Sequence, residues 1–246
     1  MNTVVDKFQI DAVIVVSGRG ERMELGYSKV LLRVNNITLL EHTIRQLESA
    51  NVNRLFILCD TVMYKDKECA KLVQQYPNIT LYQRKKVKYD STFQILKEFI
   101  IANHSVSSKI LFEYGHSPHP SQYYNYISKL EMNNGVIATL FSSSTRKDTA
   151  IGRCGKYIEP PYVISSELIN LSSAGRWSEF FDENRKETVE IDLLDAPNEF
   201  NSHDEYEKYS EYVRNNYLPR ILVDNTVGFP QRFTGVPTTK NLVEVG

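Results

Sequence analysis

The sequence has little of several features that mark specialised protein classes. Its 246 residues include only 3 cysteines, 11 glycines and 9 prolines, which excludes a disulfide-rich scaffold, a collagen-like repeat and a proline-rich disordered chain. No charge of one sign dominates, because 29 basic and 30 acidic residues leave a formal charge of -1. This balance excludes a global field that would attract nucleic acid or an acidic membrane. With 41% hydrophobic residues, the chain has the composition and length to bury the core of one large domain.

The cysteines and the first apolar run predict a cytoplasmic protein. Cys59, Cys69 and Cys154 show neither C-x-x-C spacing nor a neighbouring histidine pair, so they indicate neither a zinc site nor a disulfide framework. The apolar run at 12–16 is too short for a secretory signal core or a transmembrane helix. We therefore expect a reducing, cytoplasmic environment, with no nucleic-acid partner and no membrane partner.

Short β-branched runs alternate with segments of helical periodicity as far as residue 141. Strands are predicted at 12–16, 54–59, 78–82 and 109–113, and helices at 38–51, 65–76 and 91–101. This alternation predicts a three-layer α/β/α fold, in which a mostly parallel, Rossmann-like sheet carries helices on both faces. Ligands of such sheets bind outside the carboxyl ends of the strands. We therefore expect the loops after Val16, Cys59 and Glu113 to share one rim.

The pattern is looser in the second half of the chain. Glu159-Pro160-Pro161 is expected to break regular structure before a short strand or turn. Short helices at 166–171 and 176–181, a strand at 188–193 and a helix at 202–216 are predicted after it. We expect a single domain over 1–216 with an acceptor-side insertion at about 142–185. The remaining residues, 217–246, are either a disordered end or an arm packed on a second copy of the chain.

A glycine loop directly after the first strand is the most informative segment. It reads Val15-Val16-Ser17-Gly18-Arg19-Gly20-Glu21-Arg22-Met23 and is followed by Ser28-Lys29. A Rossmann fingerprint requires a third glycine where Met23 stands, and a Walker loop requires a Gly-Lys-Ser/Thr sequence that is absent. An ordinary glycine turn with solvated Arg22 and Lys29 is the alternative to a functional loop.

The loop resembles the signature of the nucleoside triphosphate transferases, written G-x-G-x-R-M/L, a short spacer and Pro/Ser-Lys. The match falls on Gly18, Gly20, Arg22, Met23, Ser28 and Lys29. That family includes molybdenum cofactor guanylyltransferases, methylerythritol phosphate cytidylyltransferases and sugar-phosphate nucleotidyltransferases. The resemblance implies the nucleotide-diphospho-sugar transferase type of fold. It also implies an enzyme that transfers NMP from CTP, GTP or UTP to a small phosphorylated or hydroxylated acceptor and releases pyrophosphate.

The chemistry of these residue types suits that reaction. Glycines allow main-chain N–H groups to approach phosphate oxygens, so Gly18, Arg19 and Gly20 are expected to hold the triphosphate, with Ser17 near the nucleoside. Nucleotidyl transfer depends mostly on positioning and on neutralising negative charge. Arg22 and Lys29 supply fixed positive charges and are the predicted catalytic residues.

A second landmark falls after the strand at 109–113, where the family carries Gly-Asp-x-Pro and its aspartate helps to hold a divalent cation. This sequence reads Gly115-His116-Ser117-Pro118, with His116 at the aspartate position. Imidazole is a poor ligand for Mg²⁺ but suits Mn²⁺, Co²⁺ or Zn²⁺. His116 therefore binds a softer metal, donates directly to a phosphate, marks lost catalysis, or only bonds loop carbonyls. The neighbouring His119 is expected at the surface.

Three weaker resemblances complete the predicted site. Asn201, just before the helix at 202–216, matches a second metal position of the family, so a divalent metal (Mg or Mn) bound by His116 and Asn201 is expected. Asp90 and Ser91 resemble a segment that cytidylyltransferases place beside the base and ribose, although Ser91 also suits an ordinary helix N-cap. Arg146 and Lys147 are predicted to bind the acceptor, against the alternative of a solvated charged loop.

Two classes of function follow from this sequence. The first is a nucleotidyltransferase whose partners are an NTP and a small-molecule acceptor, with a homodimer as a further expectation. The second is a non-catalytic nucleotide-binding homologue, a sensor or partner subunit, that has lost the metal aspartate. Release of pyrophosphate discriminates between the two.

Overall fold

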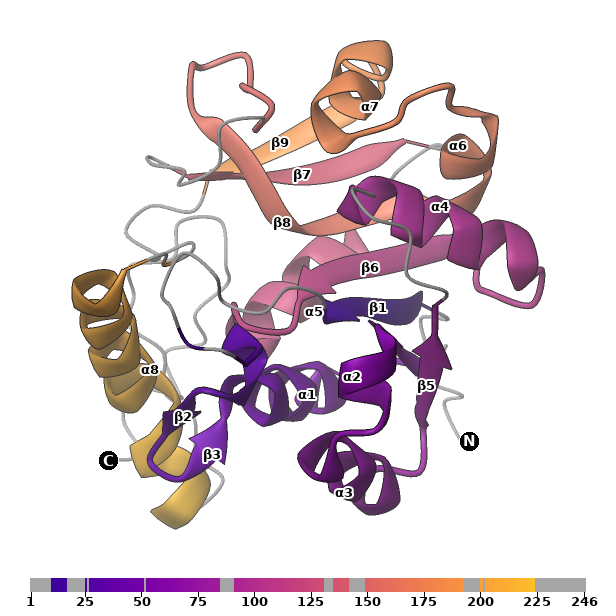
Figure 1. Cartoon of the computed structure of the whole chain (residues 1–246). Coiled ribbons are helices and arrows are strands. Elements are labelled where there is room, and N and C mark those ends of the chain that lie inside the picture. Colours follow the sequence, from indigo (N-terminus) through magenta and orange to yellow (C-terminus); the bar gives the residue numbers. More distant parts are fainter. Residues whose placement is uncertain are drawn as a thin grey trace, which may run out of the picture.

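The computed structural model describes residues 10–16, 25, 27–50, 52–84, 91–130, 135–141, 149–192, 200 and 202–223, with side chains as far as residue 214. A seven-stranded sheet with the order β5-β4-β1-β6-β8-β7-β9 forms its centre (Figure 1). Its strands are β1 (Ile10–Val16), β4 (Leu55–Cys59), β5 (Ile79–Gln83), β6 (Lys109–Tyr114), β7 (Val136–Phe141), β8 (Tyr157–Ser165) and β9 (Thr188–Asp192). A separate two-stranded hairpin is formed by β2 (Arg33–Val34) and β3 (Ile37–Thr38).

Parallel pairing aligns the carboxyl ends of the central strands. β1 pairs with β4 on one side and β6 on the other, and Val15 lies opposite both Leu58 and Tyr114. β8 runs antiparallel to its neighbours β6 and β7, whereas β7 and β9 are again parallel. The predicted mostly parallel sheet is confirmed, and the carboxyl ends of β1, β4 and β6 lie at one edge of it.

Alternate residues of β1 divide the core into two layers. Ala12, Ile14 and Val16 pack in a cluster with helices on one face of the sheet, and Val13 and Val15 pack in a cluster on the other. The first face is covered by α1 (Leu39–Ser49), α2 (Thr61–Tyr64), α3 (Lys67–Gln75) and α5 (Ser121–Lys129), and the second by α4 (Thr92–Ala102), α6 (Ser166–Leu171) and α7 (Trp177–Glu183). Helices therefore lie on both sides of the sheet, as the α/β/α prediction requires.

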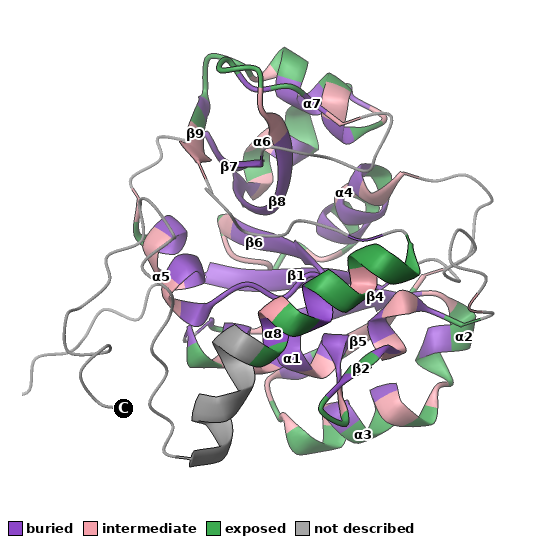
Figure 2. Cartoon of the chain, turned by 90° about the vertical axis from the view of Figure 1, so that its left-hand side faces the viewer, coloured by how far each residue is buried: buried purple, intermediate pink, exposed green. Residues whose placement is uncertain are grey.

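The last helix covers the hairpin rather than either face of the sheet. Tyr209 and Val213 of α8 (His203–Val223) pack with Leu32, Val34 and Leu39 in a third, smaller cluster. Figure 2 shows α8 crossing the molecule with an exposed outer face. The predicted helix at 202–216 is confirmed and continues as backbone to Val223.

One prediction for the second half of the chain is wrong. Residues 159–161 do not break regular structure, because β8 runs through them for nine residues. The Pro160–Pro161 peptide bond is cis, and the prolines fall where the pairing of β8 with β7 changes register, between Ile137 and Thr139. Proline cannot donate to a strand ladder, and an irregular point in the pairing is a position that tolerates it.

Most other predicted elements agree with the structure to within two residues. Phe93, Leu96, Phe99 and Ile100 of α4 are buried, as their spacing predicted. Thr38 caps α1, since its side chain accepts a hydrogen bond from the N–H of Glu41. In the described part of the chain, no helix combines the length and apolar character needed to cross a membrane.

Candidate functional site

The end of β6 lies directly beside the end of β1. The N–H of Gly115 donates to the carbonyl of Val15 at 3.4 Å, which extends the strand pairing by one residue. A side chain at position 115 would crowd the core, because a Cβ there would lie 3.1 Å from Val16 and 3.2 Å from Leu40. Glycine therefore lets the loop after β6 leave the sheet close to α1 and next to the carboxyl end of β1.

His116 lies at this rim between two aromatic rings. Its imidazole stacks on Tyr114, with centroids 5.7 Å apart and an interplanar angle of 15°. It also meets the ring of Phe200 edge-on at 6.0 Å. The side chain is nearly buried, with 9% relative exposure. The fold thus brings the predicted residue to the expected edge, where its ring plane is set by its neighbours.

Lys29 contacts the same phenylalanine, although the two residues are far apart in the sequence. It lies in a single 3-10 turn, η2 (Lys29–Leu31), and its ammonium donates to the carbonyl of Phe200. The Nζ atom also lies 5.1 Å from the centroid of the Phe200 ring, a cation–π distance. Lys29 and His116 therefore meet around Phe200, which the sequence did not single out. Its position directly before Asn201 was the available signal.

Several predicted site residues lie outside the described residues. They are the glycine-loop residues Ser17, Gly18, Arg19, Gly20 and Arg22, the nucleoside residue Asp90, the acceptor residues Arg146 and Lys147, and the metal residue Asn201. Their predicted roles stay predictions. Of the predicted site residues, the structure describes Lys29, Ser91 and His116.

Ser91 is the N-cap of α4. Its hydroxyl accepts from the N–H of Gln94 at 3.1 Å and donates to the carbonyl of Gly175 at 2.5 Å, and the Gln94 side chain completes a capping box. This cap also ties α4 to the turn before α7. The structure thus contains the N-cap that Ser91 was expected to suit, and its predicted contact with the nucleoside stays a prediction.

A buried polar network lies beneath the His116 loop, and it corrects one prediction. His119 is not at the surface, because only 2% of it is exposed. Its Nδ1 donates to Glu113 at 2.9 Å, and the hydroxyl of Tyr124 donates to the same carboxyl oxygen at 3.0 Å. Burial raises the pKa of Tyr124 well above its ordinary value, which keeps this hydroxyl protonated as a donor.

Sequence comparison identifies part of the chain. Residues 12–85 match the profile of the MobA-like NTP transferase domain. The match begins in β1, spans the glycine loop and Lys29, and ends after β5. No curated protein matches the chain significantly by sequence.

Solved structures extend the likeness over most of the chain. A nucleotidyl transferase from Methanothermobacter superposes with a TM-score of 0.66 at 20% identity, covering 85% of this chain and 99% of that one. The inositol-1-phosphate CTP transferase from T. maritima gives 0.62 at 14% identity, with coverages of 84% and 96%. A Mycobacterium tuberculosis protein in complex with manganese gives 0.56 at 14% identity, with coverages of 82% and 98%. The chain has a nucleotidyltransferase fold. The resemblance predicted from the glycine loop is confirmed.

In this nucleotidyltransferase fold, the described residues alone do not make a Mg²⁺ site. Magnesium prefers carboxylate and water oxygens, but the ring of His116 is packed between Tyr114 and Phe200. The carboxyl group of Glu113, the nearest acid in sequence, is occupied by His119 and Tyr124. Within the described residues, no three His, Cys, Asp or Glu side chains gather as a metal ligand set.

Proposed function

We propose that the chain is a nucleotidyltransferase that transfers NMP from CTP, GTP or UTP to a small phosphorylated or hydroxylated acceptor. The convergence of Lys29 and His116 on Phe200, at the rim where β1 and β6 end, carries this proposal. Ligands of parallel α/β sheets bind at such a rim. The match of residues 12–85 to the MobA-like NTP transferase domain supports it.

In the proposed reaction, an acceptor oxygen attacks the α-phosphorus of the NTP, the new P–O bond forms, and the bond to pyrophosphate breaks. The main-chain N–H groups of Gly18, Arg19 and Gly20 hold the triphosphate, with Ser17 and Asp90 beside the nucleoside. Arg22 and Lys29 neutralise negative charge on the phosphates as pyrophosphate departs. Arg146 and Lys147 bind the acceptor, and the protein works in the cytoplasm, where its three cysteines stay reduced.

His116 donates a hydrogen bond to the phosphates in this proposal. The likeness to a manganese-bound structure supports a divalent cation, Mg or Mn, at the predicted position of His116 and Asn201. These two interpretations of His116 differ in their dependence on the metal, so one experiment separates them.

Thermal unfolding with each of CTP, GTP, UTP and ATP, in Mg²⁺, in Mn²⁺ and in EDTA, tests nucleotide binding. A ligand at 100 times its Kd stabilises the folded state by about 2.7 kcal/mol, which raises the Tm of a chain of this size by roughly 5–10 °C. We expect one nucleotide to give such a shift and Lys29→Ala to reduce it. The matched control is Lys65→Ala, at an exposed lysine directly after α2. No shift with any nucleotide would contradict the proposal.

A second candidate function is a nucleotide-binding protein without transferase activity. The histidine at position 116, where the resembling family carries a metal aspartate, favours it. Such a protein shows the thermal shift but releases no pyrophosphate with any acceptor or metal. Pyrophosphate release with a phosphorylated or hydroxylated acceptor decides for the transferase.

A further inference from the structure

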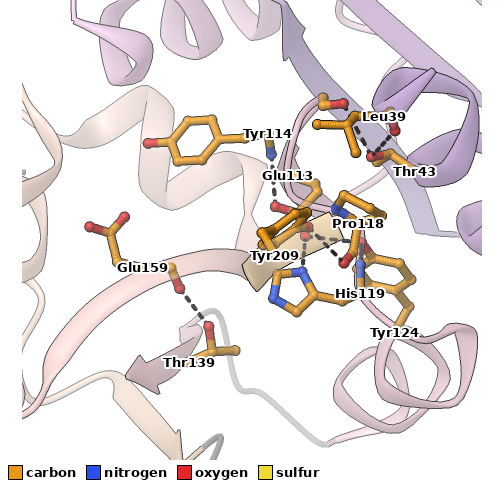
Figure 3. A network of polar contacts seen from close by, with 11 residues as sticks. Leu39, Thr43, Glu113, Tyr114, Pro118, His119, Tyr124, Thr139, Glu159 and Tyr209 are labelled. Carbon is orange, nitrogen blue, oxygen red and sulfur yellow. Dashed lines mark hydrogen bonds and ion pairs between the residues drawn. The ribbon is translucent and has the colours of Figure 1, made fainter. Parts of the chain in front are cut away.

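The carboxyl group of Glu113 is a buried anchor beneath the His116 loop. It lies in strand β6 after the apolar residues Ile110, Leu111 and Phe112, and 0% of the residue is exposed. Three donors reach it: the N–H of Tyr114 at 2.8 Å on one oxygen, and His119 Nδ1 at 2.9 Å and the Tyr124 hydroxyl at 3.0 Å on the other (Figure 3). A buried carboxyl group is costly unless it is compensated in this way.

These contacts close the loop that carries His116. At the start of the loop, the Gly115 carbonyl accepts from the hydroxyl of Thr43 on α1 at 3.3 Å. At its end, the hydroxyl of Tyr124 on α5 accepts from the N–H of His119 at 3.0 Å while it donates to Glu113. Both ends of the segment 115–119 are thus attached to the core, and His116 lies between them.

The same loop is tied to the helix that follows Phe200. The hydroxyl of Tyr209 on α8 donates to the carbonyl of Pro118 at 3.3 Å. Tyr209 also packs on Phe200 with centroids 5.2 Å apart. Phe200 in turn contacts His116 and Lys29. The position of the loop therefore bears on both described residues of the proposed nucleotide site.

His119 has one anchor among the described residues. Its Nε2 is buried without a hydrogen-bond partner there, and its ring is surrounded by Tyr123, Tyr124 and Phe141. The hydrogen bond from Nδ1 to Glu113 therefore fixes both the orientation of the ring and the proton on Nδ1. Loss of this side-chain bond leaves the end of the loop held by the N–H of His119 and the carbonyl of Pro118.

We propose that Glu113 and His119 are positioning residues, which hold the 115–119 loop so that His116 faces the nucleotide phosphates. The inference rests on the proposed function of the site, and it adds two residues that neither the glycine-loop resemblance nor the profile match at 12–85 assigns. A purely structural network would lower the Tm without changing the environment of His116.

A set of matched variants separates these two roles. His119→Leu removes the donor to Glu113, whereas His119→Asn retains an amide donor close to the position of Nδ1. Tyr124→Phe removes the second donor and keeps the ring, which provides a mild variant should His119→Leu fail to fold. Asp11→Asn is the control, because it disturbs a buried carboxylate paired with Arg54 at the opposite end of β1.

The first measurement needs no nucleotide. The imidazole resonances of His116, recorded by NMR in the full chain, carry ring-current shifts from Tyr114 and Phe200. We expect His119→Leu and Tyr124→Phe to move these resonances, His119→Asn to restore them, and Asp11→Asn to leave them in place. Unchanged His116 resonances in folded His119→Leu or Tyr124→Phe would overturn the proposal, whether or not any nucleotide binds.

The second measurement is a double-mutant cycle on the affinity for the nucleotide that gives the thermal shift. We expect His119→Leu to weaken binding about tenfold, equivalent to one hydrogen bond to a charged group. In a His116→Ala background, the same change should weaken binding much less, because most of its effect passes through His116. Equal losses in both backgrounds would overturn the positioning role. Absence of any binding by the wild type contradicts the proposed function instead and leaves the NMR result to decide the inference.

Discussion

Lys29 has two partners of different chemistry at one residue. Its ammonium donates to the main-chain carbonyl of Phe200 and lies over the phenyl ring of the same residue. These contacts hold the 3-10 turn η2 against the start of α8. They also hold a positive charge at the rim of the sheet, close to the proposed triphosphate site. We therefore expect the Lys29 side chain to contribute little to the stability of the fold and much to nucleotide binding.

Replacement of Lys29 by Ala separates the two contributions. We expect the Tm to stay near that of the wild type, because a partly exposed cation–π contact contributes about 0.5–1 kcal/mol. We expect nucleotide affinity to fall by about 10- to 100-fold, the equivalent of one lost charge-assisted hydrogen bond. Thermal unfolding and isothermal titration calorimetry measure the two effects. Lys29→Met, which retains the aliphatic stem, should share the affinity loss. A variant with full turnover would contradict the assigned role.

At the scale of elements, the N-terminus of α4 is hydrogen-bonded to the start of α7. Ser91 caps the helix and also donates to the carbonyl of Gly175, which lies just before α7. The next residue, Thr92, accepts a hydrogen bond from the indole of Trp177 at 2.9 Å. α4 and α7 are therefore attached through two neighbouring side chains of the same helix end.

Ser91→Ala removes the cap and should lower the free energy of unfolding by about 1 kcal/mol, which corresponds to a fall in Tm of roughly 2–4 °C for a chain of this size. Ser91→Asp keeps a capping acceptor but loses the donor to Gly175, so its Tm should lie between those of the wild type and Ser91→Ala. Calorimetry measures the difference. A large loss of nucleotide affinity in Ser91→Asp would instead support the predicted nucleoside contact.

The elements that could be predicted from the sequence are those whose signals are local. Apolar runs identified β1 and β4, the Thr38 and Ser91 caps identified the starts of α1 and α4, and the spacing in α4 identified its buried face. β8 was missed because its prolines lie at a register change, which depends on the position of β7. Within the local sequence, a pair of prolines indicates the end of a strand. Only the pairing with strands that are distant in the sequence shows that the strand continues.

The candidate site was predictable to the same extent. The glycine loop and Lys29 belong to one segment of sequence, and His116 follows a predicted strand end. The partnership of Glu113 with His119 and Tyr124 depends on how α5 folds back against β6, which no local pattern records. A glutamate directly after the apolar run Ile110-Leu111-Phe112 was the available signal, because a buried carboxyl group requires donors from elsewhere.

At the scale of the whole molecule, one central sheet carries a core cluster on each of its two faces. α1 closes one of these faces and carries His42, of which 0% is exposed. The Nε2 of His42 lies 3.3 Å from the carbonyl of Val34 in the hairpin, and its Nδ1 has no hydrogen-bond partner among the described residues. Burial, helped by the nearby charge of Arg45, lowers the pKa of His42 from 6.5 to about 4.

This shift makes global stability depend on pH in a defined window. Unfolded chains bind a proton at His42 near pH 6.5, whereas the folded chain resists protonation until about pH 4. The stabilising effect is therefore complete above pH 6.5 and is lost as the pH falls from 6.5 towards 4, with an upper limit of about 3 kcal/mol. Because His42 is buried in the helix that covers the central sheet, we expect the loss to appear in the Tm.

Denaturant unfolding between pH 7 and pH 4 tests this expectation. His42→Gln retains an N–H donor for the Val34 carbonyl but does not titrate, so its stability should fall less steeply over this window than that of the wild type. His104→Gln is the matched control, since His104 is exposed and its replacement should leave the wild-type slope unchanged. If His42→Gln and the wild type lost stability in parallel, the acid sensitivity would have to arise from other groups.

Asp11 is one such group, because hydrogen bonds from Arg54 and Ser107 outweigh burial and hold its pKa below the usual value. Its contribution is lost only below about pH 4, so a steep loss between pH 6.5 and 5 belongs to His42.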